Sequence, residues 1–161
     1  MQKRFYIWAM LRIALGLIFL WAFIDKVFGL GFSTARDAAW IHGGSPTTGF
    51  LLYATKGPFA SFFQSLAGNT LIDWLFMIGL LVIGLALITG IFVKLASATG
   101  ALMLLFMWLA VLPPEHHPFL DDHLIYLLVL IGFIVVHAGK HLGFGTWWTH
   151  HKLVKKYPIL E

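Results

Sequence analysis

The sequence contains no cysteine and few charged residues. Because none of the 161 residues is a cysteine, the chain forms no disulfide, thiolate nucleophile or cysteine-ligated zinc or iron–sulfur centre of its own. Charged residues make up only 11% of the chain, against about a quarter in an ordinary soluble domain. The eleven basic and seven acidic side chains are too scattered for a nucleic-acid-binding face. Any redox function therefore needs a cofactor or a partner, and nucleic acid is not an expected partner.

Apolar residues, in contrast, are abundant. They make up 60% of the chain, and the mean hydropathy is +0.86. One soluble core of this size would leave too much apolar surface exposed to water. The sequence therefore predicts a membrane protein surrounded by lipid, and nothing divides residues 1–161 into more than one domain.

Four apolar segments have about the length that a membrane crossing requires. A hydrocarbon core about 30 Å thick needs about 20 helical residues. The candidate spans are residues 5–24, 74–93, 95–112 and 123–139. They are continuously apolar rather than alternating, which disfavours a barrel. The first follows a charged start but has no small-residue cleavage site, so we expect it to be retained. We predict an all-α integral membrane four-helix bundle.

The basic residues predict the orientation of this bundle. With both termini on one side, that side holds seven basic residues and the other side holds Lys26, Arg36 and Lys56. The side richer in Lys and Arg is normally cytoplasmic. We therefore expect a multi-pass protein of the cell membrane, with both termini and a basic tail, residues 140–161, in the cytoplasm.

The outer connection, residues 25–73, is too long to lack structure in so short a chain. Residues 45–47 read Ser-Pro-Thr, a helix-start signal, and the apolar residues 49–53 follow. A Lys-Gly-Pro break at 56–58 precedes a second apolar stretch at 59–66. Both stretches are too short to span, so we predict interfacial or re-entrant helices that cap the outer end. A loop that simply packs on the surface is the alternative.

Arg12 and His137 are ionisable residues within predicted spans, where polar groups need a partner. Arg12 lies about 10 Å inside its apolar segment. It either extends its side chain back to the cytoplasmic face or pairs with a carbonyl, a ligand or a lipid headgroup. His137 lies at a comparable depth, and the two define a candidate inner pocket for a quinone carbonyl. A structural histidine is the alternative for His137.

A denser polar group is expected at the outer end. Asp25 and Lys26 follow the first span, and residues 115–117 (Glu-His-His) and 121–123 (Asp-Asp-His) lie between the third and fourth spans. If short loops bring these ends together, the group could relay protons, bind a divalent metal or hold a polar substrate. The candidate catalytic residues are Asp25, Lys26, Asp121, Asp122 and His123. The alternative is that Asp121 or Asp122 caps the fourth helix and the others are solvated.

Two cofactor types fit the sequence poorly. No spacing matches a specific metal motif, so we assign no metal ligands. Haem is not expected, because His137 is the one histidine well inside a span and His123 lies about 21 Å away along the same helix.

Small residues four apart predict which spans pack closely. Ala86 and Gly90 in the second span, and Ala96 and Gly100 in the third, let backbones approach each other. We expect the second and third spans to form a tight antiparallel pair.

Several short motifs resemble the DoxX family of membrane proteins. They are the Arg-x-x-x-Gly pattern in residues 11–19, followed by Asp-Lys-Val-Phe at 25–28, with further similar stretches at 43–47 and 118–123. The resemblance implies a four-helix membrane protein associated with thiosulfate:quinone oxidoreductase activity or with complexes for oxidative and thiol stress. Arg12, Lys26, Asp121, Asp122 and His123 match motif residues.

Three functions remain open at this point. The first is a quinone-linked oxidoreductase or its membrane subunit, in which Arg12 and His137, or the outer acidic group, contact the quinone. Without cysteine, sulfur oxidation would need direct transfer to quinone or a second subunit. The second is a non-catalytic scaffold that recruits soluble redox proteins through its basic tail. The third is a small-solute or lipid carrier with the outer connection as its lid. A homo-oligomer is compatible with each.

Overall fold

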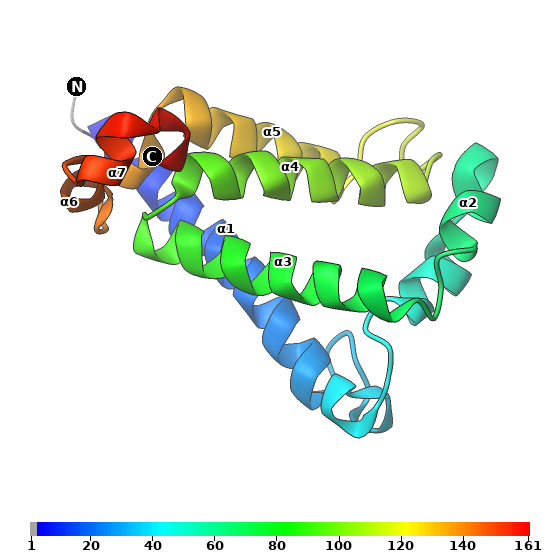
Figure 1. The fold of residues 1–161 in the computed structure, drawn as a ribbon. Helices are drawn as coiled ribbons and strands as arrows, with labels where there is room; N and C mark the ends of the chain where they lie inside the picture. The colour runs from blue at the N-terminus through cyan, green and yellow to red at the C-terminus, as the bar shows by residue number, and fades with distance from the viewer. Residues whose placement is uncertain (1–2) are drawn as a thin grey trace.

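The computed structural model describes residues 3–161, with side chains from residue 5 onward. In this part of the chain 72% of the residues are helical and there is no strand. The four longest helices are α1 (Lys3–Phe28), α3 (Thr70–Thr89), α4 (Val93–Ala110) and α5 (Asp122–Val135). Figure 1 shows them as two layers, with α1 packed on α3 and α4 packed on α5. The predicted all-α class is confirmed.

Three helices are long and apolar enough to cross a membrane, namely Phe5–Phe28, Thr70–Thr89 and Val93–Ala110. Helix α5 is also apolar but has 14 residues, a length of about 21 Å. The predicted fourth span to residue 139 is therefore too long. Helix α5 ends at Val135 because His137 adopts a left-handed conformation, with φ of 52°, which does not continue a right-handed α-helix.

The ends of the other helices follow from local capping. The Asn69 side chain accepts a hydrogen bond from the Leu71 N–H, so α3 begins at Thr70, four residues before the predicted Trp74. Gly90, with φ of 80°, ends α3 in the left-handed conformation that glycine tolerates. Asp121 caps α5 by accepting a hydrogen bond from the Leu124 N–H.

The helices alternate in direction, which gives the molecule two distinct ends (Figure 1). We call the end with the start of α1, the α3–α4 turn and residues 136–161 the inner end. The outer end contains residues 29–69 and 111–121. Arg36 and Lys56 belong to the outer end, and Lys26 lies in the last turn of α1 beside it. The inner end holds Lys94, Lys140, Lys152, Lys155 and Lys156. The fold thus divides the basic residues as the sequence predicted.

Glycines set the closest helix contact. A Cβ atom on Gly84 of α3 would lie 2.8 Å from the backbone nitrogen of Leu20, and one on Gly16 of α1 would lie 2.9 Å from Cβ of Leu87. Gly100 of α4 lies against both Leu130 of α5 and Ile83 of α3, where the added Cβ would lie 3.1 Å from Cδ1 and 3.4 Å from Cγ2, respectively. Helices α3 and α4 are antiparallel and in contact, as expected, but α3 packs more extensively on α1, and α4 on α5.

The outer connection is ordered, as expected. It contains the 3-10 helices η1 (Arg36–Ala38), η2 (Trp40–His42) and η4 (Gly57–Phe59), the π-helix η3 (Phe50–Ala54), and the α-helix α2 (Ala60–Gln64). Leu51 and Phe63 pack against Ala110 at the end of α4, and the Lys56 N–H donates to the Ala110 carbonyl (3.0 Å). The connection, which leads from α1 to α3 in the chain, therefore also packs against the end of α4. Its interfacial position stays a prediction.

The tail folds back on the inner end. It contains the 3-10 helices η5 (Ala138–Lys140) and η6 (Pro158–Leu160) and the short helices α6 (Gly145–Thr149) and α7 (Lys152–Lys156). The Phe144 N–H donates to the Thr89 carbonyl (2.8 Å), and the Lys94 N–H donates to the backbone oxygen of Glu161 (2.7 Å). The tail therefore covers the turn between α3 and α4.

Candidate functional site

Arg12 is fully buried near the inner end of α1. Its Nη1 donates to the Gly139 carbonyl (3.3 Å) and its Nη2 to the Leu142 carbonyl (2.7 Å), whereas its Nε has no hydrogen-bond partner. No acidic side chain of residues 5–161 pairs with it. The prediction of a buried arginine that pairs with carbonyls is confirmed, and extension to the surface is wrong. The guanidinium joins the segment after α5 to α1.

Two glycines make room for this guanidinium. A Cβ atom on Gly90 would collide with Nη1 of Arg12, and one on Gly143 would lie 3.1 Å from Nη2. Gly90 also has the positive φ that disfavours other residues. The helix end at Gly90 and the burial of Arg12 therefore depend on each other.

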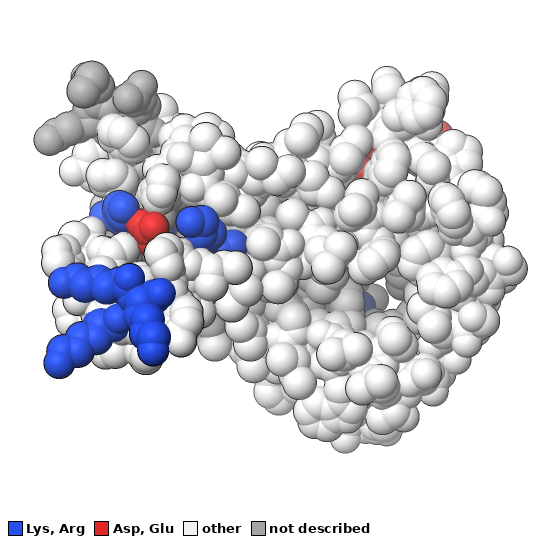
Figure 2. Space-filling view, turned by 45° about the horizontal axis from the view of Figure 1, so that its top comes forward, with Lys and Arg blue, Asp and Glu red and all other residues white. Residues whose placement is uncertain are grey.

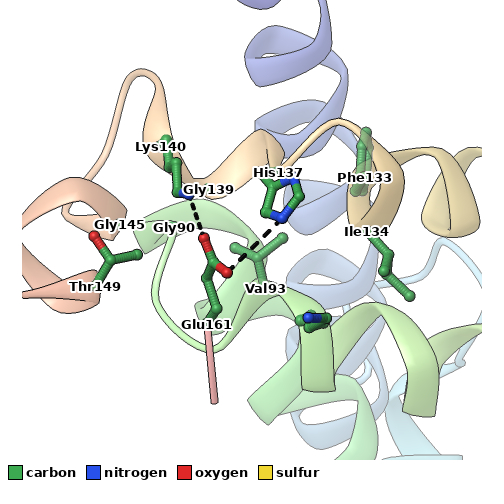
Figure 3. Close-up of a pocket in the computed structure, with 11 residues that line it drawn as sticks. Gly90, Val93, Phe133, Ile134, His137, Gly139, Lys140, Gly145, Thr149 and Glu161 are labelled. Atoms are coloured by element: carbon green, nitrogen blue, oxygen red, sulfur yellow. Dashed lines mark ion pairs between the residues drawn. The ribbon is translucent and has the colours of Figure 1, made fainter. Parts of the chain in front are cut away.

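His137 lines a small pocket that Arg12 does not itself line, although Gly90 and Gly139, which contact Arg12, lie between them in its wall. It lies beyond the end of α5 with its side chain 49% exposed, and its Nε2 is 3.9 Å from Oε2 of Glu161. Lys140 holds the other carboxylate oxygen of Glu161 at 2.6 Å (Figure 3). The pocket that these three residues line has a volume of about 20 Å³, which is room for about one water molecule. A quinone ring does not fit there.

Asp25 lies one turn before the outer end of α1 and is 1% exposed. Its Oδ2 accepts hydrogen bonds from the Ser33 N–H (2.8 Å) and the Ser33 hydroxyl (2.7 Å), and its Oδ1 accepts a longer one from the Phe32 N–H (3.3 Å). The carboxylate therefore fixes the turn that follows α1. Hydrogen bonds of this kind allow a carboxylate to stay charged when it is buried.

Lys26 points in a different direction from Asp25. Its Nζ lies 5.9 Å from the centre of the Phe76 ring of α3, a cation–π arrangement. The side chain is half-buried, and it forms no ion pair with an acidic residue in the described part of the chain. Lys26 thus contacts α3 rather than the loop that Asp25 holds.

Asp121 and His123 form a close pair at the start of α5. Nδ1 of His123 is 2.6 Å from Oδ2 of Asp121, whose Oδ1 caps the helix. Asp122 is exposed beside them. The capping alternative is therefore confirmed for Asp121.

The expected convergence of the outer polar residues is not found. In Figure 1 the outer end of α1 lies well apart from the connection between α4 and α5. Among the described residues, no three His, Asp or Glu side chains lie close enough to hold a metal ion. The physical reason is that α1 packs along α3, and Asp25 is bound by its own following loop.

Asp73 is a buried residue that the sequence reasoning did not select. Its Oδ1 accepts hydrogen bonds from the hydroxyls of Ser45 (2.8 Å) and Thr47 (2.5 Å). These two residues belong to the Ser-Pro-Thr segment from which a helix start was predicted. Their hydroxyls therefore also hold that segment against α3. Asp73 joins the outer connection to α3.

A groove of about 620 Å³ runs along the side of α1 near Asp25. Its walls are apolar except at one end, where Asp25 and Ser33 lie; the apolar lining residues are Leu17, Ile18, Trp21, Ala22 and Phe32. Trp21 and Phe32 meet edge to face, with ring centres 5.2 Å apart. The groove is open along its outer side, so part of this volume lies beyond the protein surface.

The groove was missed because half of its polar end comes from the loop at residues 32–33. A partial signal was present, since Leu17, Trp21 and Asp25 recur every four residues and so share one face of α1. Leu17 and Ile18 are about half exposed, so no other helix covers this face. In a bilayer, lipid would border the groove.

Fold and site together define the class of the protein, an all-helical chain with three helices able to cross a membrane and a side-facing apolar groove. Comparison with protein-family models, curated proteins and solved structures gave no match to this chain.

Proposed function

We propose that this protein is a DoxX-like, multi-pass integral membrane subunit of a quinone-linked redox system, and that the groove beside Asp25 binds the quinone. One observation carries the proposal. The groove opens sideways from α1, is apolar along its length, and ends at a buried carboxylate. A lipid-soluble ring entering from the bilayer needs this combination of an apolar path and a polar end.

The arrangement of the four helices supports four membrane crossings with both termini in the cytoplasm. Helix α5 is short but runs from the outer end to the inner end beside α4 (Figure 1). A short span is accommodated by local thinning of the bilayer or by flanking residues. The excess of lysines at the inner end favours that end as the cytoplasmic one.

The groove residues suit the chemistry of a quinone–quinol pair. The Trp21 and Phe32 rings offer flat apolar surface, and the Asp25 carboxylate, held by Ser33, would accept a hydrogen bond from the hydroxyl of the reduced form. A bound quinone would supply two-electron, two-proton carrier chemistry. The chain has no cysteine, so a thiol of its own cannot be the electron donor, and the proposal assigns that role to a partner. A soluble redox protein is the proposed partner.

Asp25 is the group that would accept a hydrogen bond from a bound quinol. Its Oδ2 already accepts two short hydrogen bonds from Ser33, whereas the hydrogen bond that Oδ1 accepts from the Phe32 N–H is longer, so Oδ1 is the atom that a hydroxyl donor would contact. Ser33 holds the carboxylate in position. Arg12 is buried and hydrogen-bonded to two carbonyls at the inner end, and it does not line the groove. Catalytic roles for Lys26, Asp121, Asp122 and His123 stay predictions.

The test measures quinone binding after tryptophan replaces one of two alanines of α1, one inside the groove and one outside it. Ala22 lines the groove, and Ala14 is exposed on the same helix outside the set of lining residues. We expect Ala22→Trp to fill the groove and to weaken binding of a short-chain ubiquinone analogue at least about tenfold, because a residue as large as Trp takes up most of a ring-sized volume. Ala14→Trp should leave binding unchanged. Binding is followed by equilibrium dialysis of the protein in neutral nanodiscs.

Two results would contradict the proposal. One is equal quinone binding by the two variants, and the other is no binding by the wild-type protein. Retention of phospholipid or fatty acid in the groove without quinone would instead favour the lipid carrier.

A further inference from the structure

The folded tail concentrates positive charge on one short helix. Lys152, Lys155 and Lys156 lie on α7 at spacings of three and four residues, so they share one helix face. All three are exposed, and none forms an ion pair with an acidic side chain of the part of the chain described here. Figure 2 shows the basic side chains fanning out at this end of the molecule.

The packing of α7 fixes the direction of these lysines. Val154, between them, is only 4% exposed and attaches α7 to the rest of the tail. The Leu153 N–H donates to the His151 ring, which caps the start of the helix. Because Val154 points inward, the lysine face points away from the protein.

Exposed aromatic residues lie in the same segment. Trp147 is 65% exposed and Phe144 is 63% exposed. Nζ of Lys156 lies 5.3 Å from the centre of the Tyr157 ring. Protein surfaces that lie at the headgroup level of a bilayer are rich in lysine, tryptophan and tyrosine.

We propose that the folded tail, residues 140–161, is a binding site for the phosphate groups of anionic phospholipids at the inner face of the membrane. The occupant is lipid rather than an acidic soluble protein, because large apolar rings accompany the lysines and because the tail is held against the helix ends, next to the headgroups. The inference rests on the proposed insertion in a bilayer and is independent of the quinone.

The tail's own acidic residue does not compete for these lysines. Among residues 140–161 the acidic side chain is Glu161, and it is bound by Lys140 at 2.6 Å. Lysines near an anionic surface contribute about 1 kcal/mol each, or about fivefold in affinity. Three of them together correspond to about a hundredfold.

The experiment compares lipid retention by three forms of the full-length protein in detergent, using native mass spectrometry during titration with phosphatidylglycerol or phosphatidylcholine. The first form is wild type. The second carries Lys152→Gln, Lys155→Gln and Lys156→Gln, and the control carries Arg36→Gln and Lys56→Gln at the outer end. We expect the triple variant to lose between 10-fold and about 100-fold of the affinity for phosphatidylglycerol. The control and all phosphatidylcholine titrations should be unchanged.

The outcomes separate the inference from the proposed function. Failure of wild type to float with neutral vesicles would remove the membrane insertion on which both depend. Flotation with equal phosphatidylglycerol affinity in wild type and triple variant would overturn the lipid site alone. Tight binding of poly-glutamate in neutral nanodiscs, without any phosphatidylglycerol preference, would assign the surface to an acidic protein and also overturn it. Circular dichroism of the triple variant checks that its helices are intact.

Discussion

Arg12→Met is the most informative substitution at the inner end, because it removes the charge and keeps a long apolar side chain. Arg12 donates two hydrogen bonds to buried or half-buried carbonyls of the segment that follows α5. Hydrogen bonds to charged groups contribute about 1.5–3 kcal/mol each, so the gross loss is about 3–6 kcal/mol. Removing an unpaired buried charge, with its unsatisfied Nε, offsets part of that loss. We expect a net destabilisation of about 2–4 kcal/mol.

The assay for this variant is thermal unfolding in detergent combined with hydrogen exchange. For a chain of this size, 2–4 kcal/mol corresponds to a decrease in Tm of about 5–15 °C. Exchange should accelerate most in residues 138–160, which the guanidinium holds against α1. Arg12→Lys should recover only part of the stability, because one ammonium cannot reproduce the two-pronged contact of a guanidinium.

The matched control is Arg36→Met, since Arg36 is exposed in the outer connection and its side chain forms no hydrogen bond or ion pair within the described residues. That variant should change Tm by no more than about 1 °C. If Arg12→Met left both Tm and exchange of the tail unchanged, the view that Arg12 joins the tail to α1 would be refuted.

Two further substitutions test the packing and the capping. Gly84→Ala places a Cβ 2.8 Å from the Leu20 nitrogen, and we expect about 1–3 kcal/mol of destabilisation in thermal unfolding. Gly79→Ala, whose Cβ would lie 3.6 Å from the Met103 sulfur, is its control and should be nearly neutral. Asp121→Ala removes the cap of α5 and should cost about 1 kcal/mol, whereas Asp122→Ala should cost less than about 0.5 kcal/mol. Equal Tm values within either pair would contradict the structural reason given.

The helices could be predicted because their signal is local. Three continuously apolar runs gave three membrane-length helices, with ends within a few residues of the observed ones. The short elements of the outer connection were predictable in part, because Pro46 and Gly49 precede η3, whereas the expected break at Gly57 and Pro58 is itself the start of η4. The deep position of Arg12 in an apolar run required a buried partner, and the carbonyls of Gly139 and Leu142 supply it.

The arrangement of the helices could not be predicted because it depends on competition between similar surfaces. Small residues occur on α1, α3 and α4 alike, and only the three-dimensional fit shows that Gly16 meets Gly84. The end of α5 at Val135 has no proline or glycine immediately after it, so the left-handed turn at His137 left no trace in the sequence pattern. The separation of Asp25 from Asp121 follows from this helix pairing.

Helix α1 carries two buried ionisable groups, Arg12 and Asp25. Their surroundings predict that substitution of Arg12 affects only stability, whereas substitution of Asp25 also affects quinone binding. Backbone carbonyls surround the charge of Arg12, and the neighbouring pocket has room for about one water molecule. Asp25 is bound on one side by Ser33 and borders the groove on the other. Asp25→Asn, which replaces one accepting oxygen with an NH2 donor, should therefore weaken quinone binding and also loosen the turn that Ser33 forms with α1, which lowers Tm. Arg12→Met should lower Tm without a direct effect on the groove. If quinone affinity fell with Arg12→Met at a temperature where the variant is folded, and was insensitive to Asp25→Asn, the ligand would lie at the inner end and the groove would be a surface for lipid alone.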